Sequence, residues 1–260
     1  MRAGTVQANG LEFGLLEAGS GPLALCLHGF PDTAHTWGRL LPALARAGFH
    51  AVALHEVLGG GGDAVLIGHD WGAEAAYAAA AYAPDRWRRL VTLAVPPTAL
   101  DPVLFSDYDQ LRRFFYLFMF RDPAGLGEAA AAAGGMAFLD RLWADWSPGY
   151  HPGQHLARVK QSLRQPANLA AAIGYYRAAD PPSTPRAPQG TTRQAAGPAP
   201  PPTLYLHGAN DGCIAADLAR RAGPLLAPSS RAIVVDGAGH FLHLEKPGEV
   251  TSHILAWITS

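Results

Sequence analysis

Three polar side chains that could together form and hydrolyse a covalent ester each follow an apolar run of the chain. Asp70 stands in the sequence GHDWGA (residues 68–73), and Asp211 and His240 follow two later runs in the same manner. A carboxylate can act as a nucleophile. A histidine oriented by a second carboxylate can activate the water that releases the ester. We therefore take Asp70, Asp211 and His240 as candidate nucleophile, acid and base.

The residues around Asp70 have the pattern of a tight turn between a strand and a helix. Gly68 and Gly72 flank it, as the glycines of a G-x-S-x-G nucleophile elbow do, with aspartate in place of serine. A helix N-cap is the alternative role for this aspartate. Nucleophile, acid and histidine in that chain order, each at the carboxyl end of a strand, predict a catalytic triad of Asp70, Asp211 and His240.

A fourth segment, HGFPD at residues 28–32, follows the first strand that we expect in the central sheet. In a fold with such an elbow, this loop and the residue after the nucleophile supply the backbone N–H groups of an oxyanion hole. We therefore predict that the amides of Phe30 and Trp71 have this role. The histidines show no metal-ligand spacing, since His240 and His243 lack a third ligand, and we expect no metal and no cofactor.

The elements that must position these side chains can be read from apolar runs bounded by glycine or proline. The runs that predict strands are 23–27, 49–54, 64–67, 90–95, 203–206 and 232–235. The segments that predict helices are 37–47, 73–83 and 249–258. Apolar strands without alternation, separated by helices, are typical of a doubly wound, mostly parallel α/β sheet.

The remaining part of the chain divides by composition. Residues 101–180 read as helices with many aromatic side chains, and residues 181–202 contain eight prolines, which suits an extended connector. We expect a core formed by residues 1–100 and 203–260, with a helical cap inserted at 101–180 and a proline-rich connector at 181–202.

Four motifs together resemble the soluble epoxide hydrolases of the α/β-hydrolase superfamily. They are HGFPD at 28–32, GHDWGA at 68–73, HGANDG at 207–212 and GAGHFLHLEKP at 237–247. The resemblance covers nearly the whole chain and implies the α/β-hydrolase fold. Haloalkane dehalogenases are similar too, because they share the aspartate nucleophile.

The resemblance implies a reaction that converts an apolar epoxide to a vicinal diol. An ester would form on Asp70, and water activated by the His240–Asp211 pair would hydrolyse it. In epoxide hydrolases two cap tyrosines protonate the epoxide oxygen, and Tyr116 and Tyr176 lie in segments similar to those that carry them. Packing within the cap is the alternative role for both tyrosines. The residues that we expect in the substrate pocket are Phe30, Trp71, Phe115, Tyr175 and Phe241.

The chain departs from this family between the strand at 49–54 and the strand that precedes Asp70. Only residues 55–63 intervene, where relatives have a loop and a long helix, so the crossover is unusually short. We expect apolar sheet surface to be exposed beside it. Two alternatives to an epoxide hydrolase stay open. One is a haloalkane dehalogenase, which has the same aspartate nucleophile, and the other is a relative that binds ligands but is catalytically impaired because of the missing crossover segment.

Composition and charge restrict the remaining classes. The formal net charge of −1 at pH 7 provides no field to hold a nucleic acid. The densest apolar stretch, residues 114–120, is far shorter than the roughly 20 residues that span a bilayer. Residues 1–10 lack the apolar core of a signal peptide, so we expect a cytoplasmic protein. Cys26 and Cys213 could form at most one disulfide, and the sequence does not specify an oligomeric state.

Overall fold

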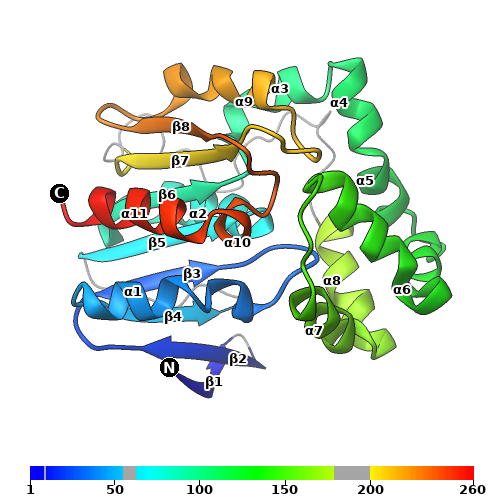
Figure 1. Cartoon of the computed structure of the whole chain (residues 1–260), viewed down its shortest axis with the longest axis horizontal. Coiled ribbons are helices and arrows are strands. Elements are labelled where there is room, and N and C mark those ends of the chain that lie inside the picture. The colour runs from blue at the N-terminus through cyan, green and yellow to red at the C-terminus, as the bar shows by residue number, and fades with distance from the viewer. Residues whose placement is uncertain (9, 55–62, 179–199) are drawn as a thin grey trace.

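The computed structural model describes residues 1–8, 10–54, 63–178 and 200–260, and its main element is an eight-stranded sheet (Figure 1). The strands are β1 (Arg2–Ala8), β2 (Leu11–Ala18), β3 (Leu23–Leu27), β4 (His50–Leu54), β5 (Ala64–His69), β6 (Trp87–Leu93), β7 (Thr203–Gly208) and β8 (Arg231–Val235). Their order is β1-β2-β4-β3-β5-β6-β7-β8. Strands β3 to β8 are parallel, whereas β1 and β2 form an antiparallel hairpin at one edge. The sheet is therefore mostly parallel, as the sequence predicts.

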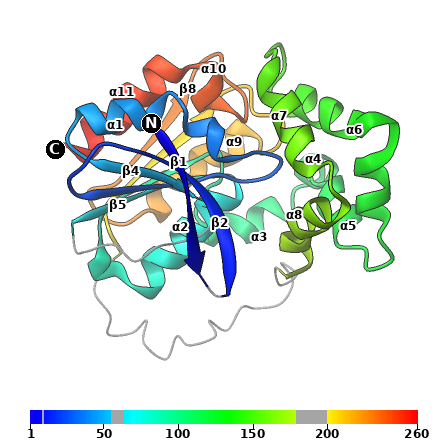
Figure 2. The ribbon, with the colours of Figure 1, turned by 90° about the horizontal axis from the view of Figure 1, so that it is seen from below.

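Helices cover both faces of this sheet, which explains why its central strands are apolar throughout. Helices α1 (Leu40–Arg46) and α11 (Pro247–Ile258) lie on one face, and α2 (Trp71–Tyr82) lies on the other (Figure 2). Every residue of β5 and of β7 is buried. The remaining short helices outside the insertion described next are η1 (Ala34–Trp37), η2 (Pro84–Arg86), η3 (Thr98–Leu100), α9 (Ala216–Ala219), η4 (Arg220–Leu225) and α10 (Leu242–Glu245).

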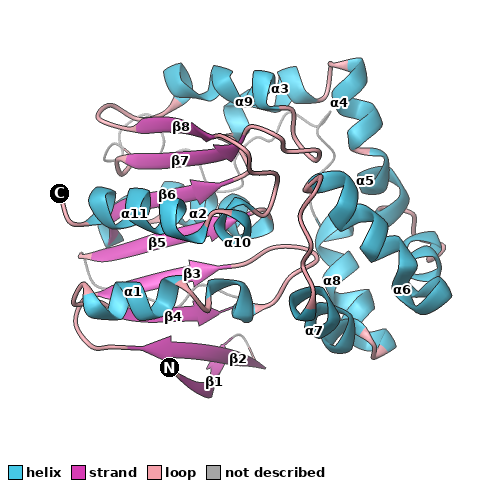
Figure 3. Ribbon diagram, in the orientation of Figure 1, coloured by secondary structure: helices cyan, strands magenta, loops and turns pink. Residues whose placement is uncertain are grey.

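Six α-helices follow the short helix η3 between β6 and β7 in the described part of the chain, and we call residues 101–178 the helical insertion. They are α3 (Asp101–Leu104), α4 (Tyr108–Arg113), α5 (Phe115–Phe120), α6 (Leu126–Trp146), α7 (Gln154–Leu163) and α8 (Pro166–Ala178). The insertion lies beyond the carboxyl ends of the parallel strands, toward which the arrowheads point (Figure 3). Its apolar side chains form one buried cluster with Phe30 and Phe241 of the sheet loops. The insertion therefore covers the end of the sheet where parallel strands place their sites.

The amino-terminal hairpin, which the sequence analysis did not predict, changes the expectation for the sheet surface next to the short crossover. Leu25, Leu27 and Val52 belong to a buried cluster with α2, and Val6 and Phe13 of the hairpin pack against that cluster. The expectation of exposed apolar surface is wrong for these side chains. The hairpin and α2 together cover this part of the sheet.

Two predicted segments fall largely outside the described residues. These are the crossover at 55–63, of which only Asp63 is described, and the connector at 181–202, of which residues 200–202 are described. In the sheet, β3 lies between β4 and β5. Cys26 and Cys213 are both buried free thiols, so no disulfide joins them. Among the described helices, none combines the length and the apolar character that crossing a membrane requires.

Candidate active site

The backbone at Asp70 has the strained turn that an elbow requires. Asp70 directly follows β5 and precedes α2, with φ 54° and ψ −124°, a conformation that residues other than glycine rarely adopt. A Cβ on Gly72 would overlap the carbonyl of Leu27, and one on Gly68 would overlap the carbonyl of Gly72. Both glycines are therefore needed for the close approach of β3, β5 and α2 that presents the Asp70 carboxylate.

The three predicted triad side chains lie together and are buried. His240, in the loop between β8 and α10, places Nδ1 3.0 Å from Oδ2 of Asp211 and Nε2 3.4 Å from Oδ2 of Asp70. Oδ1 of Asp211 accepts hydrogen bonds from the amides of Cys213 (2.7 Å) and Ile214 (3.0 Å). The Asp211 carboxylate is thus fixed by the backbone on one side and directed at the imidazole on the other.

The charges around His240 determine its protonation. Burial by itself lowers the pKa of this histidine, but the carboxylates of Asp211 and Asp70 outweigh burial and raise the pKa to about 10. Burial raises the pKa of the Asp211 carboxyl, and the opposing effect of His240 leaves it below its ordinary value. In the free protein at neutral pH, His240 is therefore an imidazolium ion held between two carboxylates.

The two oxygens of Asp70 have different surroundings. The amide of Phe30 donates a hydrogen bond of 2.7 Å to Oδ1. A Cβ on Gly29 would overlap both Oδ1 and the amide nitrogen of Trp71, so the absence of a side chain at Gly29 lets this loop approach Asp70 closely. Oδ2 instead faces His240. One oxygen is held by the backbone, and the other is directed at the imidazole.

The two predicted tyrosines lie next to this carboxylate, on different helices of the insertion. Tyr116 of α5 and Tyr176 of α8 are buried, and their ring centroids are 5.9 Å apart. The Tyr176 ring contacts Trp71 (5.0 Å), and its hydroxyl has no hydrogen-bond partner among the described residues. Burial raises the pKa of both hydroxyls, and the nearby charge of Asp70 raises both further. Both therefore stay protonated at neutral pH.

The five side chains predicted to line a pocket differ in their burial and in their contacts with the site. Phe30 packs edge-on against Tyr176, with centroids 5.5 Å apart, and Trp71 also contacts that ring edge-on. Phe241 is buried behind His240, where it stacks on a tryptophan of α6. Tyr175 is 38% exposed with its ring 6.2 Å from Trp71. Phe115 is half exposed.

Cys213 is a neighbour of the site that the sequence analysis did not single out. Its Sγ lies 3.3 Å from the Tyr116 hydroxyl, and its amide is one of the two that bind Asp211. The sequence feature that could have indicated this contact is the position of Cys213, two residues after the predicted acid Asp211. Cys213 therefore contacts both a predicted proton donor and the acid.

A surface cleft of about 470 Å³ lies on the outer side of Asp211. Its lining includes Arg113, Asp145 and Arg220 together with Asp211, but neither Asp70 nor His240. This polar cleft differs from the apolar pocket that the sequence leads us to expect beside the nucleophile.

Comparison with known proteins agrees with the fold. Residues 58–247 match the family model of the alpha/beta hydrolase fold, and the chain belongs to this family. It is 26% identical over 318 aligned positions to epoxide hydrolase A of Mycobacterium tuberculosis, and the match covers 98% of this chain and 96% of that protein. It is also 26% identical to an epoxide hydrolase of Caballeronia sordidicola, with 97% and 92% covered.

Solved structures show the same fold along the whole chain. The crystal structure of epoxide hydrolase A from Mycobacterium thermoresistibile superposes with a TM-score of 0.77 at 23% identity, covering 100% of this chain and 98% of the other. A putative alpha/beta hydrolase from Nostoc sp PCC 7120 has a TM-score of 0.79 at 23% identity, covering 99% and 98%. The predicted fold class is confirmed.

Proposed function

We propose that this chain is an epoxide hydrolase that converts an apolar epoxide to a vicinal diol through an ester on Asp70. The observation that carries the proposal is the arrangement around Asp70, with one oxygen bound to a backbone amide, the other facing His240, and two buried tyrosines beside them. The names of the two relatives that match nearly the full chain support it. In this proposal the helical insertion acts as a cap over the site.

The first step needs a nucleophile and a proton donor. Oδ2 of Asp70 attacks an epoxide carbon, and the carbon–oxygen bond of the ring breaks with its electron pair on the oxygen. That oxygen would leave as an alkoxide, which is a poor leaving group, unless a tyrosine hydroxyl supplies a proton. The unpartnered hydroxyl of Tyr176 and the Tyr116 hydroxyl beside it are the proposed donors.

The second step hydrolyses the ester. His240 takes a proton from water, the water oxygen adds to the carboxyl carbon of Asp70, and Asp211 stabilises the imidazolium that forms. Negative charge develops on Oδ1, the oxygen that already accepts the Phe30 amide. When the tetrahedral intermediate collapses, the ester bond breaks and the His240 imidazolium gives its proton to the departing oxygen of the diol. The proton that remains on the Asp70 carboxyl passes through water to the tyrosinate left by the first step, which restores the free site.

Ester formation itself prepares His240 for the second step, which predicts a pH dependence. An ester on Asp70 removes one of the two charges that raise the pKa of His240 to about 10, so this pKa falls in the intermediate. Hydrolysis needs the neutral imidazole, so the rate of ester decay should rise with pH until this lowered pKa is passed. Ester formation does not need the neutral imidazole, so its rate should stay constant over the same pH range. Single-turnover quenched-flow measurements from roughly pH 6 to 10 separate the two rates, and pH-independent decay would contradict the assignment of His240 as the base.

The choice between epoxide and haloalkane depends on the leaving group. A halide leaves as a stable anion and needs N–H donors only, whereas buried tyrosine hydroxyls suit an alkoxide that must be protonated. The purified chain is expected to release a diol from styrene oxide and no chloride from 1-chlorobutane. Chloride release without diol would favour a dehalogenase. A folded sample that releases neither product would favour a relative that binds ligands without turnover.

A further inference from the structure

The segment GAGHFLHLEKP at residues 237–247, which carries His240, also contains a glutamate that the proposed mechanism does not use. Glu245 is the last residue of α10. The amides of Leu244 and Glu245 both donate to the carbonyl of Phe241, at 2.8 and 3.0 Å. This short helix therefore bends the chain back directly after the base, and the Glu245 carboxylate returns to the loop that carries His240.

The Glu245 carboxylate holds the residues on both sides of His240. Oε2 of Glu245 accepts the amide of Gly239 (2.8 Å), and Oε1 accepts the hydroxyl of Ser147 (2.7 Å). The oxygen of Ser147, which is buried, accepts in turn the amide of Phe241 (3.1 Å). Hydrogen bonds to an ionised acceptor are stronger than those between neutral groups. One carboxylate thus fixes the loop directly at Gly239 and through a hydroxyl at Phe241.

The amide of His240 itself is bound to the end of the long helix α6. This helix ends at Trp146, whose carbonyl lies beyond the last hydrogen bond within the helix. The Trp146 carbonyl accepts the amide of His240 (3.0 Å) and the amide of Gly212 (3.0 Å), the residue after Asp211. A carbonyl oxygen has two lone pairs and can accept both. The loops of the acid and the base are therefore joined through one atom of the insertion.

Two glycines allow these loops to lie directly against the end of α6. A Cβ on Gly212 would overlap the carbonyl of Asp145, and a Cβ on Gly239 would overlap the Cα of Ser147. The contact therefore joins backbone to backbone, with little freedom for either loop to move. A change in the hydrogen bonds at this contact should be felt at the imidazole of the base.

We propose that Glu245 and Ser147 are positioning residues, which hold the imidazole of His240 where it takes a proton from water during ester hydrolysis. Both act on His240 through its neighbours in the chain, so neither is a catalytic group itself. This inference rests on the proposed function. Ester formation needs no base, so the Glu245–Ser147 pair should matter for the second step and not for the first.

Two other roles for Glu245 predict different results. A carboxylate that only stabilised the fold would, when removed, slow both steps alike. A carboxylate that acted through its charge would shift the pH midpoint of ester decay. The carboxylates that raise the pKa of His240 are those of Asp211 and Asp70, whereas Glu245 bonds an amide and a hydroxyl. The positioning role therefore predicts slower ester decay with an unchanged pH midpoint.

The test compares Glu245→Gln and Ser147→Ala with the unmodified full chain, using styrene oxide as the substrate. The amide nitrogen of glutamine cannot accept a hydrogen bond, and alanine lacks the hydroxyl that links Glu245 to Phe241. Each variant should slow ester decay by roughly 10- to 100-fold, while ester formation stays within about 2-fold of the unmodified rate. Intact-mass spectrometry of rapid-quench single-turnover samples, repeated across pH, gives both rates.

Glu249→Gln and Ser252→Ala, which alter exposed side chains of α11, are the matched controls. The Ser252 hydroxyl bonds the carbonyl of Gly248, on the surface of that helix. Both controls should leave ester formation and ester decay unchanged. Circular dichroism checks the folding of each variant. If Glu245→Gln does not fold, Ser147→Ala, which removes a single oxygen atom, still tests the proposal.

Hydrogen exchange gives a second readout that needs no epoxide. In both variants the amides of residues 239–241 should exchange at least about 10-fold faster than in the unmodified chain, and the controls should not change. Equal slowing of both steps, unchanged ester decay, a shifted pH midpoint or unchanged exchange would each overturn the proposal. An unmodified chain that forms no ester would instead contradict the proposed function, and with it this role in catalysis. The exchange measurement would then still show whether Glu245 holds the loop.

Discussion

The substitution His240→Gln should stop the reaction after the first step, so that the covalent ester accumulates. Incubated with styrene oxide, the variant is expected to gain the mass of one epoxide, attached to Asp70, and to lose at least about 1000-fold in turnover. Glutamine can fill the space beside Asp211 but cannot accept a proton from water. Ester formation needs no base and should continue. Intact-mass spectrometry detects the adduct, and peptide mapping locates it.

Two controls test whether the added mass is attached to Asp70 and whether it requires the loss of His240. His240→Gln combined with Asp70→Ala should gain no mass, because the attacking oxygen is gone. His253→Gln, which alters a partly exposed histidine of α11, should turn over normally without a lasting adduct. If the unmodified chain releases diol while His240→Gln gains no mass, the covalent route is wrong and water attacks the epoxide directly.

Removing both proposed proton donors should have the second largest effect. In the His240→Gln background, Tyr116→Phe together with Tyr176→Phe is expected to slow adduct formation by roughly 1000-fold or more, because the epoxide oxygen must then leave unprotonated. Each single substitution should slow adduct formation less than the double substitution does, because the remaining hydroxyl lies beside the same carboxylate. The rate of mass gain in rapid-quench samples measures the alkylation step alone.

Tyr108→Phe is the matched control, since Tyr108 lies on α4 of the same insertion and is 76% exposed. Its rate of adduct formation should equal that of the His240→Gln parent. An unchanged rate in the Tyr116 and Tyr176 double variant would show that these hydroxyls pack the insertion and that another donor protonates the oxygen.

The central sheet could be predicted because its strands are buried on both faces, and strands of that kind appear in a sequence as short, unbroken apolar runs. The run at 23–27 coincides with β3, and that at 203–206 lies within β7. The hairpin β1–β2 was missed because its strands are not continuous apolar runs. Polar residues such as Thr5, Gln7 and Glu12 interrupt them on an exposed edge, where alternation rather than an apolar run marks a strand. Its cover of the sheet face became visible only through long-range packing.

The helix expected at 37–47 shows how a local pattern misplaces a boundary. The chain instead forms a short 3₁₀ turn, η1, that ends at Trp37, and α1 begins at Leu40 after Gly38. The apolar side chains of both pieces face the core, so their spacing resembled that of a single helix. The ends of helices depend on local hydrogen bonds that periodicity does not report.

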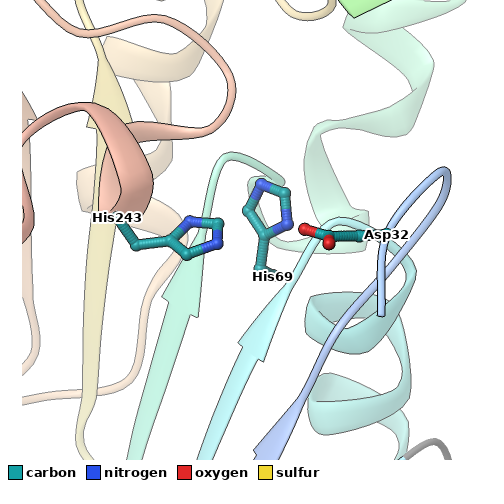
Figure 4. A group of neighbouring side chains, drawn as sticks. All are labelled: Asp32, His69 and His243. Carbon is teal, nitrogen blue, oxygen red and sulfur yellow. The ribbon is translucent and has the colours of Figure 1, made fainter. Parts of the chain in front are cut away.

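In the site, too, local sequence patterns predict some features, whereas others depend on contacts between distant parts of the chain. The proximity of Asp70, Asp211 and His240 could be anticipated because all three follow strands that end at one edge of the sheet. The contact between Cys213 and Tyr116 could not, since it joins a loop to a helix of the insertion. Nor could the proximity of three other buried side chains, Asp32, His69 and His243, which lie far apart in the chain (Figure 4).

Because the site is buried, its opening to solvent can limit the turnover rate. Asp70 is 6% exposed and Tyr176 is 1% exposed, beneath the aromatic rings that join the insertion to the sheet loops. In the proposed mechanism an epoxide reaches the carboxylate after these rings separate, and the diol leaves after they separate again. Each turnover therefore includes two openings of the aromatic contact, and the frequency of opening sets an upper limit on kcat, whatever the speed of the chemical steps.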